Sequence, residues 1–153
     1  MARVFIIYDT KYGNTKLAAE KIAEGIRGHK GIETEISDVK EADLKKIADA
    51  DAILIGAPNH MGSPSRTIMK FIDKLGRLKL KAKGAAAFDT YLGADFEKAM
   101  KKMENRIREK IPSLKLMTSG LSVRVDGSKG PITQGELPKC AEFGRKIAVQ
   151  LKT

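Results

Sequence analysis

The sequence has few of the residues that build metal and disulfide sites: its 153 residues include one cysteine, two histidines and no tryptophan. The single cysteine, Cys140, excludes a disulfide within the chain and any iron–sulfur or zinc site made from cysteines. His29 and His60 are far apart in the sequence, and neither HExxH nor CxxC spacing occurs. We therefore expect no metal site.

Long hydrophobic runs are lacking as well. The apolar run near the start, residues 4–8, is shorter than the core of a signal peptide, and no stretch approaches the length of a membrane span. We therefore expect a cytoplasmic protein that does not associate with membranes.

What is present describes one globular domain over residues 1–153. Hydrophobic residues make up 42% of the chain, which is enough for a core at this length. The 29 Lys and Arg residues outnumber the 19 Asp and Glu residues, and the formal net charge is +10. Within residues 66–83 the only acid is Asp73, and the basic residues are Arg66, Lys70, Lys74, Arg77, Lys79, Lys81 and Lys83. This excess of positive charge raises the expectation of an anionic partner.

Short apolar runs alternate with helical periodicities along the chain. We predict strands at residues 4–8, 33–37, 52–55, 85–88 and 114–125, with a helix after each one. Ser63 and Pro64 are expected to be the N-cap and first residue of the third helix, and Phe96 is expected on the buried side of the fourth. Right-handed crossovers then give a five-stranded parallel sheet with helices on both faces, a three-layer α/β/α sandwich.

In such a sheet, ligands bind beyond the carboxyl ends of the strands, which points to three loops. The first loop is Thr10-Lys11-Tyr12-Gly13-Asn14-Thr15, with hydroxyls, an amide and a glycine just before a helix. This composition suits a phosphate held by helix N–H groups, although an ordinary capped turn is the alternative. Neither GxxxxGK[ST] nor GxGxxG is present, and Gly56 to Pro58 stand where a receiver domain needs its aspartate. These absences disfavour an ATPase, a dinucleotide-binding protein and a phosphoacceptor.

The first loop resembles the T-x-T-G-N-T phosphate segment of flavodoxins, with Tyr12 in place of the second threonine. The version D-T-x-Y-G-N-T is similar to the flavodoxin-like domain of A-type diiron flavoproteins. A flavodoxin of the short-chain type implies strand order 2-1-3-4-5 and a noncovalently bound FMN at the switch point of the sheet, as is known of that family. The first loop would then hold the phosphate of FMN.

The resemblance also assigns roles to the other two loops. The second contains Pro58, Asn59, His60, Met61 and Gly62 and would lie over one face of the isoalloxazine ring. In similar flavodoxins a Met-Gly pair stacks a thioether on the ring and turns the glycine peptide so that its carbonyl accepts a hydrogen bond from reduced N5. Met61 and Gly62 match this pair. His60 is an additional residue, and it either covers the ring instead or is a solvated loop histidine.

The third loop is Asp89-Thr90-Tyr91-Leu92-Gly93. It resembles the flavodoxin segment in which a tyrosine stacks on the other face of the ring, which gives this role to Tyr91. Backbone groups of the loop, with Asp89 or Asp95, would bind the pyrimidine edge. The alternative is a tyrosine in a simple surface turn.

The sequence therefore predicts an FMN-binding, flavodoxin-like protein that carries single electrons between redox partners, with no catalytic residues of its own. The charge of +10 departs from the acidic flavodoxins and implies acidic docking surfaces on those partners. An FMN-dependent NAD(P)H:quinone-type oxidoreductase is the alternative, and a nucleic-acid-binding module is disfavoured because no motif for reading DNA or RNA occurs. We expect a monomer or weak dimer, with Cys140 as a buried structural thiol.

Overall fold

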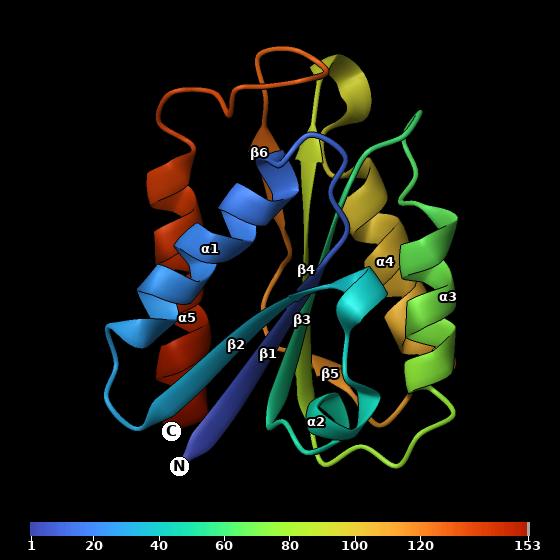
Figure 1. Ribbon diagram of the computed structural model, residues 1–153, viewed down its shortest axis with the longest axis vertical. Coiled ribbons are helices and arrows are strands. Elements are labelled where there is room, and N and C mark those ends of the chain that lie inside the picture. Colours follow the sequence, from blue (N-terminus) through green and yellow to red (C-terminus); the bar gives the residue numbers. More distant parts are fainter. Residues whose placement is uncertain (153) are drawn as a thin grey trace.

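The strands form one parallel sheet, seen in the computed structural model of the protein, which describes residues 1–152 (Figure 1). The central strands are β1 (Ala2–Tyr8), β3 (Ala52–Pro58) and β4 (Gly84–Tyr91), and β2 (Ile32–Asp38) lies at one edge. The fifth position is shared by β5 (Lys115–Leu116) and β6 (Leu121–Arg124), which both pair with β4. The predicted order 2-1-3-4-5 is confirmed.

Helices cover both faces of this sheet. Helices α1 (Asn14–Arg27) and α5 (Leu137–Lys152) lie on one face, and α2 (Leu44–Ala48), α3 (Arg66–Leu75) and α4 (Lys98–Lys110) lie on the other (Figure 1). Successive residues of β1 alternate between the two cores: Val4 and Ile6 pack towards α1 and α5, whereas Phe5 and Ile7 pack towards the other layer. The central strands are apolar along most of their length because both of their faces are buried.

Helices α1 and α5 pack backbone against backbone at two glycines. A Cβ placed on Gly144 would lie 2.1 Å from the carbonyl oxygen of Ile22, and one on Gly25 would lie 2.0 Å from that of Ala141. Any larger residue at either position would therefore force the two helices apart. Cys140 is fully buried in this layer, as predicted.

The first four predicted strands extend by up to three residues at their ends, so Asp89, Thr90 and Tyr91 of the predicted third loop are the last residues of β4. Three further features differ from the sequence predictions. Helix α3 begins at Arg66, and Ser65 is its N-cap, because the backbone of Ser63 is already engaged in a tight turn with His60. The predicted fifth strand is interrupted after Leu116. Helix α4 begins at Lys98, so Phe96 precedes the helix and is exposed rather than buried.

The interruption of the fifth strand has a cause in tertiary packing. The N–H of Gly120 donates a 3.0 Å hydrogen bond to Oε2 of Glu104 on α4, and a Cβ on Gly120 would lie 2.4 Å from the sulfur of Met100. The backbone is thereby drawn against α4 instead of pairing with β4, and regular pairing resumes at β6.

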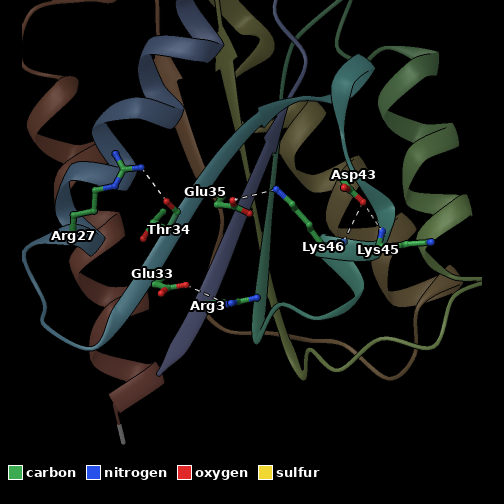
Figure 2. A network of polar contacts seen from close by, with 8 residues as sticks. All are labelled: Arg3, Arg27, Glu33, Thr34, Glu35, Asp43, Lys45 and Lys46. Carbon is green, nitrogen blue, oxygen red and sulfur yellow. Dashed lines mark hydrogen bonds and ion pairs between the residues drawn. The ribbon is translucent and has the colours of Figure 1, made fainter.

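Charged side chains of β1, β2 and the short helix α2 lie over the sheet beside α2 (Figure 2). Arg3 Nε lies 3.2 Å from Glu33 Oε2, and Lys46 Nζ lies 3.9 Å from Glu35 Oε1. Such exposed ion pairs add little to stability. They do place charge along the edge strand β2, which disfavours its pairing with another sheet. In the part of the chain that the structure describes, no helix is long and apolar enough to cross a membrane.

Candidate functional site

A cavity of about 280 Å³ opens beyond the carboxyl ends of β1, β3 and β4. These strand ends point to the top of Figure 1. All three loops selected from the sequence contribute to the cavity wall. The lining residues are Thr10, Lys11, Tyr12, Asn14, Thr15, Pro58, Asn59, His60, Thr90, Tyr91, Leu92, Asp95, Val125 and Ser128.

One end of the cavity is formed by the start of α1. Gly13, at the N-cap position, has the left-handed φ of 91°, and its N–H donates a 3.0 Å hydrogen bond to Thr10 Oγ1. No side chain caps α1, and its first turn contains no acid. Asn14 and Thr15 are the first two residues of the helix. The first N–H groups of an α-helix have no partner within the helix, and such a helix start, here at the cavity wall, stabilises an anion.

The loop after β6 completes this end of the cavity. A Cβ on Gly130 would lie 2.6 Å from Asn14 Oδ1, so the loop packs closely against the start of α1. The same loop brings Ser128, and the segment just before it brings Val125, to the cavity wall. Neither residue was selected from the sequence. The position of this loop could have indicated them, because it follows the last strand and therefore begins at the same edge of the sheet as the other three loops.

The third loop supplies the aromatic side of the cavity. Tyr91 is half-buried, and its ring packs edge-to-face against Phe96, with ring centroids 5.2 Å apart and an interplanar angle of 69°. Thr90 is buried, and its hydroxyl lies 3.0 Å from the Thr15 hydroxyl of the first loop. The aromatic wall and the start of α1 are thus connected directly.

The second loop contains a two-residue turn. The backbone groups of His60 and Ser63 exchange hydrogen bonds of 2.7 and 3.1 Å, and Met61 and Gly62 between them have φ values of 53° and 79°. Positive φ at both central positions is typical of a type I′ turn. His60 lines the cavity, whereas the Met61 side chain is fully exposed.

A buried carboxylate joins the second and third loops to α4. Asp89 Oδ2 accepts hydrogen bonds from Asn59 Nδ2 at 3.0 Å and from the Met100 N–H at 2.9 Å, and Oδ1 accepts from the Ser122 hydroxyl at 2.5 Å. Asn59 Oδ1 accepts from the Ala99 N–H at 2.9 Å. Burial raises the pKa of the Asp89 carboxyl above its ordinary value of 3.8, although these hydrogen bonds act in the opposite direction.

Eleven of the sixteen residues selected from the sequence line the cavity. The other five are Gly13, Met61, Gly62, Asp89 and Gly93. Asp89 lies in the protein interior, where it supports the loops from below. The cavity also includes Asp95, which had been considered beside Asp89 for the pyrimidine edge. Within residues 1–152 no group of three or more His, Cys, Asp or Glu side chains could hold a metal ion.

The chain belongs to the flavodoxin domain family, whose model matches residues 5–122. A flavodoxin of Aquifex aeolicus (strain VF5) is 40% identical over 93 residues, which are 59% of this chain and 50% of that protein. The chain therefore spans half the length of this relative. The family resemblance read from the three loops is confirmed.

Solved structures show the same fold. The structure of a flavodoxin from the domain Archaea has a TM-score of 0.85 and 26% sequence identity, and the match covers 99% of both chains. The flavodiiron core of Flv1 from Synechocystis sp. PCC6803 has a TM-score of 0.79 and 21% identity, over 99% of this chain and 36% of that one. The second similarity concerns the fold alone.

Proposed function

We propose that this chain binds FMN in the cavity and carries electrons one at a time between larger redox proteins. Membership of the flavodoxin family implies FMN. The observation that carries the proposal is the pairing, in one cavity, of an uncapped helix N-terminus with an aromatic wall. A phosphate needs the first, and a flat aromatic ring needs the second.

The lining residues suit the two ends of FMN. The N–H groups of the first turn of α1 would bind the phosphate, together with the hydroxyls of Thr10 and Thr15. Tyr91 would stack on one face of the ring, and His60, which lines the cavity, would contact the other face. When bound, FMN supplies a ring system that can accept and return single electrons.

We assign Met61 and Gly62 the role of holding His60 in position. They lie at the tip of the turn and outside the cavity wall, and the turn is closed by backbone hydrogen bonds on both sides. The turn holds the backbone of His60 at the mouth of the cavity. Asn59 of the same loop accepts a hydrogen bond from the Ala99 N–H of α4.

The positive net charge of the chain supports a proposal about the surface charge of its redox partners. A formal charge of +10 attracts proteins that present acidic surfaces, and exposed charges of this kind accelerate association mainly at low ionic strength. We propose that the redox partners carry acidic docking surfaces, and that electron transfer to them slows as salt is added. We place the protein in the cytoplasm, as a monomer or weak dimer.

The phosphate site is tested by comparing FMN with riboflavin, which lacks the phosphate. Fluorescence titration of the protein should show FMN bound more tightly than riboflavin. The double variant Thr10→Ala/Thr15→Ala should reduce the ratio of FMN affinity to riboflavin affinity by about 100-fold or more, because each of the two lost hydrogen bonds to a charged group is worth about 1.5–3 kcal/mol and about 1.4 kcal/mol is a factor of ten. Thr118→Ala, a threonine outside the cavity, is the matched control and should leave both affinities unchanged.

The electron-carrier role is tested by stepwise anaerobic reduction of the flavin-loaded protein. The carrier role requires a stable one-electron-reduced flavin, detected by its absorption and its electron paramagnetic resonance signal. Absence of flavin binding would refute the proposal. Turnover of NADH with a quinone, without an added reductase and without a detectable one-electron state, would favour the alternative oxidoreductase.

A further inference from the structure

Helix α3 carries a row of positive charges that nothing in the described residues neutralises. Arg66, Lys70 and Lys74 follow one another at intervals of four residues, so they lie on one side of the helix, and all three are exposed. None of them takes part in an ion pair within residues 1–152. We call these three residues the α3 basic stripe.

The neighbouring helix α4 provides a contrast. Lys98 is paired with Asp95, Lys101 with Glu97, and Arg106 forms two 2.7 Å hydrogen bonds with Asp73. The basic residues of α4 are therefore largely compensated by nearby acids. The α3 basic stripe is not, although the same surface could accommodate acids between its members.

Helix stability does not explain the α3 basic stripe. Like charges four residues apart repel each other, and a cation at the first position of a helix opposes the helix dipole. Arg66 occupies that first position, and the first turn of α3 has no acid. The helix is held instead by its Ser65 cap and by its buried face, on which Ile68, Phe71, Ile72 and Leu75 lie. Lys74 lies in the last turn, where the dipole favours a cation, but Arg66 and the repulsion along the stripe are a cost to folding, which suggests a role in binding.

The α3 basic stripe begins beside the mouth of the cavity. The turn that carries His60 leads directly into α3, and Ser63 Oγ in that turn accepts a 2.6 Å hydrogen bond from Lys102 Nζ of α4. In Figure 1 this turn stands at the top of α3, at the same end of the molecule as the cavity. Large apolar side chains are exposed at this end, namely Tyr12, Met61, Leu92 and Phe96.

We infer that the α3 basic stripe and these four exposed apolar residues form one docking surface for an acidic redox protein. This inference rests on the proposed function, because it names where the partner of the electron carrier binds. The apolar residues would make the water-excluding centre of the contact around the cavity mouth, and the stripe would make its charged rim. Charge attraction along the stripe would orient the partner so that its own cofactor faces the cavity.

A protein fits this surface better than a nucleic acid does. Binding of single strands relies on aromatic side chains that alternate with basic ones, and the exposed side of α3 has none, since Phe71 is buried. The two exposed aromatic residues of the docking surface, Tyr12 and Phe96, lie at the cavity end and do not alternate with the basic residues of α3. The apolar group at the cavity mouth matches the apolar centre of a protein interface.

The experiment uses the full chain without flavin and an acidic ferredoxin with two [4Fe–4S] clusters as the probe. Binding is measured by titration calorimetry and mapped by shifts of backbone amide resonances. The variant Arg66→Glu/Lys70→Glu/Lys74→Glu is compared with Lys30→Glu/Lys45→Glu/Lys115→Glu. The control changes the net charge equally at exposed lysines that are not in the cavity wall and form no ion pair in the described residues.

We expect the stripe variant to weaken ferredoxin binding by about tenfold or more at low salt, and the scattered control by about threefold or less. Amide shifts should centre on α3 and residues 60–63. Equal losses in both variants would overturn the inference, because net charge alone would then suffice. Lack of binding by the unmodified chain, or tighter and stripe-dependent binding to a DNA duplex, would overturn it as well.

Failure of this inference can be separated from failure of the proposed function. FMN affinity is measured for the same three proteins, and the stripe lies outside the cavity wall. If FMN binds normally and both variants lose ferredoxin affinity equally, the docking surface is rejected and the electron-carrier proposal stays intact. Lack of FMN binding by the unmodified chain would reject the proposed function itself.

Discussion

Asn59 and Asp89, at the carboxyl ends of neighbouring strands, together cap a helix to which neither belongs. Their side chains are joined by a 3.0 Å hydrogen bond, and each accepts a backbone N–H of α4, Asn59 from Ala99 and Asp89 from Met100. Glu97 occupies the N-cap position of α4 with a left-handed φ of 61° and makes no side-chain cap. The two loops that flank the cavity and the start of α4 are therefore one hydrogen-bonded unit.

Removal of the Asp89 carboxylate should destabilise this unit. In Asp89→Ala the buried Met100 N–H and the buried Ser122 hydroxyl lose their acceptor, and we expect the free energy of unfolding to fall by about 2–4 kcal/mol. Asp89→Asn keeps an acceptor oxygen and should cost about 1 kcal/mol or less. Urea unfolding at pH 7 measures both, with the exposed Asp49→Ala as control. Equal stability of Asp89→Ala and the unmodified protein would contradict this account.

The same carboxyl predicts a pH dependence of stability. Burial raises the pKa of folded Asp89 above 3.8, so the folded protein holds this proton to a higher pH than the unfolded chain does. The raised pKa adds to the free energy of unfolding while Asp89 is protonated. This stabilisation is fully present below pH 3.8 and is lost as the pH rises through the pKa of the folded protein. Stability of the unmodified protein relative to Asp89→Asn should therefore decline as pH rises above 3.8. Parallel stability curves for the two proteins would show that Asp89 is not perturbed.

Much of the architecture could be predicted because its causes are local in the sequence. The central strands contain continuous apolar runs, which indicate that both of their faces are covered, and the carboxyl ends of parallel strands meet at one edge. The three loops could therefore be grouped before their geometry was known. Tyr91 and Thr15, both selected from the sequence, line the same cavity for this reason.

The parts that could not be predicted depend on contacts between distant residues. The interruption of the fifth strand follows from the hydrogen bond between Gly120 and Glu104, which are 16 residues apart. The burial of Asp89 depends on Ser122, 33 residues away. Ser63 and Ser65 are both of a residue type that caps helices. Ser63 closes the tight turn with His60, and Ser65 is therefore the N-cap of α3.

The turn that carries His60 can be stabilised by one substitution. Met61 has a φ of 53°, which is unfavourable for a long side chain, and its side chain makes no buried contact that would compensate. Asn tolerates this conformation, and Asn-Gly is the preferred pair for a type I′ turn. We expect Met61→Asn to raise the free energy of unfolding by about 0.5–1 kcal/mol, whereas Met61→Val should lower it by a similar amount. Thermal unfolding of both variants provides the measurement, and an unstable Met61→Asn would argue against a type I′ turn.

The thiol of Cys140 should be inert in the folded protein. Burial raises its pKa to about 12, so the reactive thiolate is scarce near neutral pH, and the side chain is enclosed between α5 and α1. We expect its reaction with a thiol reagent at pH 8 to be at least about 100-fold slower than in denaturant, because local or global opening must come first. Cys140→Ala with Ser119→Cys, an exposed position, should react rapidly. A fast reaction of native Cys140 would contradict its enclosed position.

Tyr91 provides the most direct test of the ring site. Its side chain is half-buried, lines the cavity and is supported by Phe96, so loss of the ring should weaken FMN binding more than it weakens folding. We expect Tyr91→Ala to lower the affinity by about tenfold or more, since the stacking term of about 0.5–1.5 kcal/mol adds to the lost apolar contact. Tyr91→Phe keeps the ring and is the control, expected within about threefold of the unmodified protein. Because riboflavin shares the ring with FMN, Tyr91→Ala should weaken both ligands equally, in contrast to the phosphate-loop variant. A loss confined to FMN would place the ring elsewhere in the cavity.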